Sequence, residues 1–138
     1  MRSKETITER FKVLQDSICS SLEELDGQST FHEDLWTREN DGGGGRSRVI
    51  TNGDLIEKGG VNFSAVHGDL PEKIQNALGF GPSTFYATGV SIVLHSKNPW
   101  VPIIHMNVRY FETEAKAGNE STYWFGGGID LTPHYVTA

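Results

Sequence analysis

The sequence predicts an α+β protein in which one amphipathic helix precedes a set of antiparallel strands. Near the N-terminus apolar residues recur at helical spacing, whereas from Tyr86 onward they alternate with polar residues as in half-buried strands. The connections between these strands are short, which favours antiparallel pairing of neighbours. Because no repeat or linker divides the chain, residues 1–138 are expected to form a single domain.

The N-terminal helix is expected within residues 1–27. One of its faces is apolar at spacings of three and four residues, and this face comprises Ile7, Phe11, Leu14, Ile18, Leu22 and Leu25. Thr6 or Thr8 could cap the start of the helix, and Gly27 is suited to end it. Cys19 is the single cysteine, so it excludes an internal disulfide, and we interpret it as a small buried apolar residue.

Residues 31–138 are expected to form the sheet region. The predicted elements are a strand near 61–64, a short helix near 71–78 and strands at 86–95, 103–112 and 122–130. The glycine run 42–45 has neither of the spacings that bind nucleotide phosphates. We interpret it instead as a flexible loop that brings Arg46 and Arg48 towards an anionic ligand.

Composition narrows the function classes. The chain has 12 Lys and Arg against 18 Asp and Glu, a formal net charge of −6. This balance argues against a nucleic-acid partner, which usually requires a basic face. No stretch approaches the roughly 20 apolar residues of a membrane span. The N-terminus contains several acids and no apolar signal core, so we expect a cytoplasmic protein.

Two strands carry polar residues that could form a site. If Val93 lies opposite His105 and Ser91 opposite Asn107, one face gathers Ser91, His95, His105, Asn107 and Arg109. A slip of one residue would separate the two sets. Such a face could bind a carboxylate through Arg109 and exchange protons through His105. It could equally be the solvated face of an antiparallel sheet. The two histidines could also bind a metal, although the sequence places no third ligand.

A second candidate lies where three glycines precede Asp130. The glycines at 126–128 leave room for a ligand or another chain to approach the backbone. Asp130 could accept hydrogen bonds from several N–H groups of a ligand. Alternatively, it could cap the following turn through Thr132.

Several segments together resemble one family, the oxygen-dependent coproporphyrinogen III oxidases. These segments are FHEDLWTR at 31–38, GGGGRSRV at 42–49, EKGGVNFS at 57–64, TGVS at 88–91, PIIHMNVR at 102–109 and WFGGGIDLTPHY at 124–135. They occur in the family's order from about residue 31 to the end. A series of such blocks is far more specific than any lone glycine motif.

The resemblance implies a large, mostly antiparallel sheet flanked by helices on both faces, usually in a homodimer. It implies that coproporphyrinogen III and O2 give protoporphyrinogen IX, CO2 and hydrogen peroxide without an organic cofactor. His105 matches the family's proton donor, and Asp130 the acid that holds pyrrole N–H groups. The substrate-contacting positions are matched by Ser91, Asn107, Val108 and Arg109. In bacterial members the resemblance also implies a divalent metal at His95 and His105.

The sequence departs from the family pattern in one respect. A later block of the family, resembling HRxExRGIGG, does not occur, so we expect a domain truncated at Ala138. The leading hypothesis is that this span belongs to the oxidase, with Arg109 acting beside His105 and Asp130. The alternative is a non-catalytic tetrapyrrole-binding fragment or a structural domain.

Overall fold

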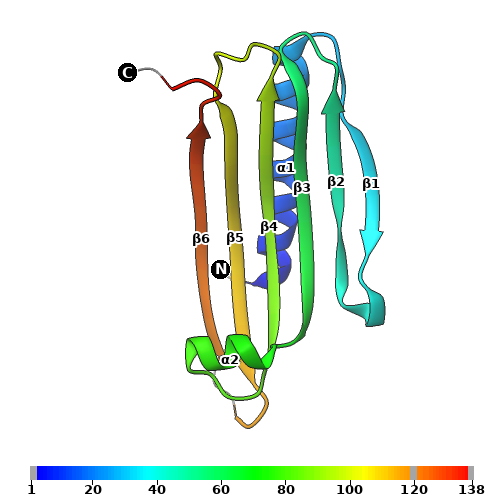
Figure 1. The fold of residues 1–138 in the computed structure, drawn as a ribbon. Coiled ribbons are helices and arrows are strands. Elements are labelled where there is room, and N and C mark those ends of the chain that lie inside the picture. The colour runs from blue at the N-terminus through cyan, green and yellow to red at the C-terminus, as the bar shows by residue number, and fades with distance from the viewer. Residues whose placement is uncertain (1–2, 119–120, 137–138) are drawn as a thin grey trace.

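The computed structural model describes residues 3–118 and 121–136. It consists of a long helix and one six-stranded antiparallel sheet, whose strands lie side by side in the order of the sequence (Figure 1). The elements are α1 (Lys4–Asp26), β1 (His32–Thr37), a 3-10 turn (Glu39–Asp41), β2 (Gly43–Thr51), β3 (Ile56–Asp69), α2 (Glu72–Leu78), β4 (Ser83–Ser96), β5 (Ile103–Ala115) and β6 (Ser121–Thr132). The predicted α+β class and antiparallel pairing are confirmed. None of the helices in the described ranges is long and apolar enough to cross a membrane.

The start of α1 differs from the prediction, whereas its end agrees. Ser3 is the N-cap, because its Oγ accepts the backbone N–H of Thr6 at 3.1 Å. Thr8 lies inside the helix, where its hydroxyl donates to the Lys4 carbonyl and lies 2.6 Å from the Tyr86 hydroxyl. Gly27 ends the helix with a φ of 74°, the left-handed conformation that glycine adopts without strain.

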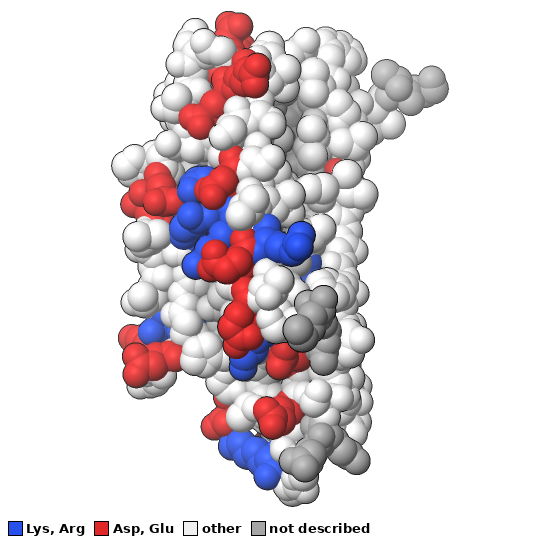
Figure 2. Space-filling view, turned by 180° about the vertical axis from the view of Figure 1, so that it is seen from behind, with Lys and Arg blue, Asp and Glu red and all other residues white. Residues whose placement is uncertain are grey.

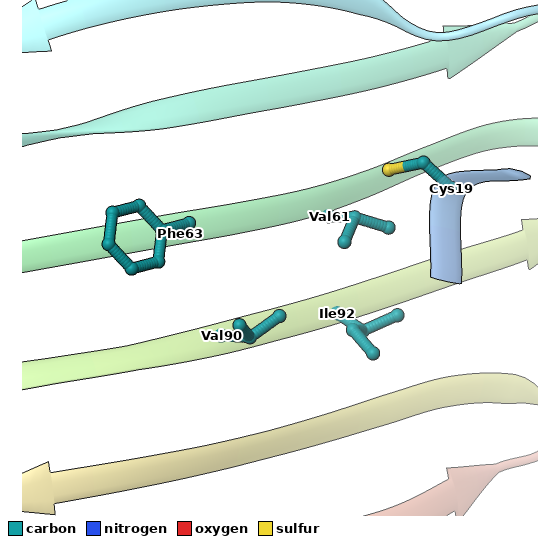
Figure 3. Packing of buried hydrophobic residues seen from close by; sticks show 5 residues of the cluster. All are labelled: Cys19, Val61, Phe63, Val90 and Ile92. Atoms are coloured by element: carbon teal, nitrogen blue, oxygen red, sulfur yellow. The ribbon is translucent and has the colours of Figure 1, made fainter. Parts of the chain in front are cut away.

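Helix α1 covers one face of the sheet and forms the core with β3 and β4. The central cluster comprises Cys19, Val61, Phe63, Val90 and Ile92, whose side chains meet between the helix and the two strands (Figure 3). The buried interpretation of Cys19 is confirmed, and burial raises the pKa of its thiol. Leu25 was expected on the buried face of the helix but is 66% exposed. In this last turn Asp26 points inward instead.

Asp26 fastens the end of α1 to the turn between β2 and β3. Its carboxylate accepts backbone N–H groups from Ser29, Asp54, Leu55 and Ile56 at 2.8 to 3.0 Å. These hydrogen bonds hold the pKa of Asp26 far below its usual range, and those from Ile56 and Ser29 have the largest effect. The carboxylate therefore satisfies the backbone N–H groups of this turn, as a capping residue satisfies those at the start of a helix.

The glycine run forms a strand, so the prediction of a flexible loop was wrong. Gly43, Gly44 and Gly45 begin β2 and pair with β3 on one side, while Gly44 and Gly45 also pair with β1. A Cβ on Gly45 would lie 2.6 Å from Cζ2 of Trp36, which is too close for any real contact. At this position the absence of a side chain lets the Trp36 ring pack against the backbone, and it does not make the segment a flexible loop.

Candidate functional site

The register between β4 and β5 is the one that gathers the predicted polar residues. Val93 lies opposite His105, and Ser91 lies opposite Asn107. Because side chains alternate along a strand, these residues point away from the face that α1 covers. We call Ser91, His105, Asn107, Arg109 and Asp130 the polar cluster. The prediction that the β4 and β5 residues share one face is confirmed.

His105 and Asp130 form a pair that the sequence did not predict. Strand β6 places Asp130 directly opposite His105, with Nδ1 of the imidazole 3.3 Å from Oδ2 of the carboxylate. The other carboxylate oxygen accepts the hydroxyl of Thr132 at 3.1 Å. A proton on Nδ1 is thereby directed to the carboxylate, which leaves Nε2 available to a ligand. Asp130 lies within β6 and accepts the Thr132 hydroxyl, and its contact with a ligand N–H stays a prediction.

Arg109 is steadied by its neighbour on the same strand. Its Nε and Nη2 both donate to Oδ1 of Asn107, at 3.2 and 2.8 Å. The residues opposite it on the two adjacent strands are Gly89 and Gly126, neither of which has a side chain to cover the guanidinium. In the described ranges no recorded ion pair includes Arg109. The remaining N–H donors therefore face solvent, where a carboxylate can reach them.

Four members of the polar cluster, Ser91, His105, Asn107 and Arg109, line a shallow hollow of about 620 Å³ on the open face. Its floor changes character along the strands. One row across the sheet runs from Ser47 through Asn62 and Ser91 to Asn107, and a parallel row contains Val66 and Ala87. The hollow thus offers hydrogen-bonding groups at one side and apolar surface at the other. A ligand that combines hydrophobic rings with carboxylates matches such a surface.

Sequence reasoning missed the contribution of β1, β2 and β3 to this hollow. Trp36, Ser47, Asn62 and Ser64 all line it. The available signal was alternation in β3, where the apolar Val61 and Phe63 are flanked by Asn62 and Ser64. It was overlooked because the strand was expected to span only four residues, whereas β3 runs from Ile56 to Asp69.

Arg46 and Arg48 lie on the opposite, helix-covered face. Arg46 donates to Oε1 of Gln15 at 2.9 Å, and Arg48 lies 2.8 Å from Asp16 and 2.9 Å from Glu33. Figure 2 views this face and shows basic residues gathered beside acidic ones. The structure therefore does not bring the two arginines to the polar cluster. The side chain of Val108 also points to this face and packs against the core.

His95 shares the open face with His105, one step further along β4. Opposite His95 on β3 is Lys58, a cation that does not favour metal binding. Across the described ranges no group of three or more His, Cys, Asp or Glu residues is arranged to hold a metal ion. The assignment of a divalent metal to His95 and His105 stays a prediction.

Comparison with known proteins places the chain in a family. The model of the coproporphyrinogen III oxidase family matches residues 6–138. Two oxygen-dependent coproporphyrinogen-III oxidases of Prochlorococcus marinus, from strain SARG and from subspecies pastoris, are 52% and 54% identical to the chain over 124 and 125 residues. Each alignment covers 88% of this chain and 34% of the relative, so the chain spans about a third of their length. By the match over residues 6–138, the chain belongs to the coproporphyrinogen III oxidase family.

Proposed function

We propose that this chain carries the substrate-facing sheet of an oxygen-dependent coproporphyrinogen III oxidase. In the reaction, two propionate groups of coproporphyrinogen III become vinyl groups and protoporphyrinogen IX is formed. Each propionate loses CO2, one proton and two electrons, and O2 takes up two electrons and two protons to give hydrogen peroxide. The observation that carries the proposal is the polar cluster beside an amphipathic hollow, in a chain of this family.

The reaction requires that a substrate propionate be held in one place. Arg109 is suited to this task because its guanidinium, held by Asn107, presents further N–H groups to solvent. Ser91 lies opposite Asn107 and can donate a hydrogen bond to the same carboxylate. Holding the carboxylate fixes which substituent reacts, and this positioning contributes to rate without any covalent chemistry.

His105 and Asp130 supply acid–base function. In the imidazolium form, Nδ1–H is directed to the carboxylate, and Nε2–H can deliver one of the protons that reduced oxygen requires. Asp130 retains lone pairs besides those used by His105 and Thr132, and its side chain is 59% exposed. It can therefore accept a pyrrole N–H and stabilise positive charge that develops on the ring. Substrate carbon and O2 exchange electrons directly, so the proposal includes no organic cofactor.

The test uses a chimaera in which residues 6–138 replace the matching third of the relative from Prochlorococcus marinus strain SARG. We expect this protein, in air, to convert coproporphyrinogen III into protoporphyrinogen, measured by chromatography, and to stop without O2. His105→Ala should lower kcat by roughly 10²- to 10⁴-fold, the usual contribution of a positioned acid or base. His67→Ala, an exposed histidine stacked on Tyr86, is the matched control and should retain the parent rate.

Each other outcome has a separate meaning. A folded chimaera that binds coproporphyrin III without turnover would favour the alternative of a tetrapyrrole-binding module. A folded chimaera that neither binds nor reacts would leave a structural role. We further infer a homodimer in the cytoplasm from the family resemblance, and light scattering of the active chimaera tests the dimer.

A further inference from the structure

Trp36 lies at the far end of the hollow from Arg109. It is on the outermost strand β1, all six residues of which are exposed, and it is one of the residues that line the hollow. The open-face row that contains it runs through Gly45, Ser64 and Gly89 to Arg109. Four strand spacings separate the two end residues, roughly 19 Å between their backbones.

The sequence of this row keeps the space between Trp36 and Arg109 clear. Gly45 and Gly89 have no side chains, and Ser64 has a small one. A Cβ on Gly45 would lie 2.6 Å from Cζ2 and 2.7 Å from Cε2 of Trp36, which shows that the indole lies directly over this glycine. The ring is therefore held close against the sheet, with its outer surface at the hollow. Its exposed fraction is 38%, so part of that surface is open to a ligand.

A simpler role is available for the same contact. An aromatic ring across from a glycine stabilises an edge pair of strands by covering the bare backbone. That role explains why Trp36 is next to Gly45. It does not require the rest of the row to be small. Nor does it explain why Arg109, at the other end of the row, has no carboxylate partner within the described ranges. The two ends together suit a ligand with an apolar ring at one end and a carboxylate at the other.

We propose that Trp36 is a substrate-positioning residue, whose indole packs against one ring of the ligand while Arg109 binds a carboxylate at the opposite side. This inference rests on the proposed function, since it concerns the same hollow. It predicts that the site recognises the span of a multi-ring ligand as well as its charge. An aromatic contact of this kind contributes about a two- to tenfold change in affinity.

The test compares two probes by calorimetry on the chain and on the chimaera. The first is coproporphyrin III, with four rings and four carboxylates, and the second is a monopyrrole that carries one propionate. Trp36→Ala should weaken binding of the tetrapyrrole by about tenfold and leave the monopyrrole unchanged. Trp36→Phe should restore most of the loss. Arg109→Gln should weaken both probes, because both carry the carboxylate.

A second variant guards against a failure of Trp36→Ala to fold. Trp36→Leu keeps an apolar side chain over Gly45 but removes the aromatic ring, so it should also weaken the tetrapyrrole selectively. In the chimaera we expect both variants to raise KM more than they lower kcat. Equal tetrapyrrole affinity in parent, Trp36→Ala and Trp36→Leu would overturn the role of Trp36 while leaving the proposed function intact. If the parent proteins bind no tetrapyrrole, both proposals fail.

Discussion

The two faces of the sheet use the same residue types for opposite purposes. On the covered face, Arg46 and Arg48 are engaged by Gln15, Asp16 and Glu33. On the open face, Arg109 has only the Asn107 amide oxygen among the side chains of the described ranges. A guanidinium that is already paired strengthens the fold, whereas an unpaired one in a hollow is available to an anion. Structural and functional arginines therefore differ in the side chains that pair with them, and not in residue type.

The largest difference between the faces should appear in stability. Phe63 is 3% exposed in the core, and its neighbour Asn62 points to the open face. Phe63→Ala should lower the free energy of unfolding by about 3–5 kcal/mol, because it removes buried apolar area and leaves a cavity. Asn62→Ala should change it by less than about 0.5 kcal/mol. Urea unfolding followed by circular dichroism measures both, and similar losses would contradict the assignment of faces.

Exchanging the arginines should separate stability from binding. Arg46→Ala leaves Oε1 of the fully buried Gln15 without its donor, which should cost about 1–3 kcal/mol of unfolding free energy. It should not alter affinity for coproporphyrin III once the protein is folded. Arg109→Ala should do the reverse, with stability retained and affinity lower by about tenfold or more. Loss of affinity in folded Arg46→Ala would place that arginine in the site after all.

A smaller effect distinguishes the two carboxylates, Asp26 and Asp130. Since folding lowers the pKa of Asp26, its ionised form stabilises the protein above about pH 4, and this contribution is lost as pH falls further. Asp26→Asn should therefore lower the melting temperature by a few degrees at pH 7, with the difference from the parent shrinking below pH 4. The exposed Asp130→Asn is the control and should melt like the parent. A difference that stays the same size from pH 7 down to pH 2 would contradict this account.

The buried and open faces could be predicted for the strands in which apolar residues clearly alternate with polar or small ones. In β4 and β5 buried Val90, Ile92 and Tyr110 alternate with polar or small residues, and the short loop between the strands limits the possible registers. The pairing of His105 with Asp130 needed the same reasoning on β6, where Trp124, Gly126, Gly128 and Asp130 share a face. A loop of uncertain length left that register open by one residue, and one residue reverses the faces.

Other features could not be predicted from local patterns. In β2 glycines and alternating Arg46, Ser47 and Arg48 give no apolar face, so neither the strand nor its orientation can be assigned. Which face Arg46 occupies depends on Gln15 and Asp16, more than 25 residues earlier in the chain. Asp26 was missed for the same reason, since its partners lie in a turn on a distant segment.

The strictly sequential strand order bears on how the protein folds while it is being synthesised. Every strand pairs with the one made just before it, so each addition closes a short loop, and the sheet can grow at the pace of the ribosome. Helix α1 is made before the strands that it packs against, β3 and β4, which are complete only when Ser96 has been translated. During that interval the apolar face of the helix has no cover, which makes it the segment of the nascent chain on which chaperones would act.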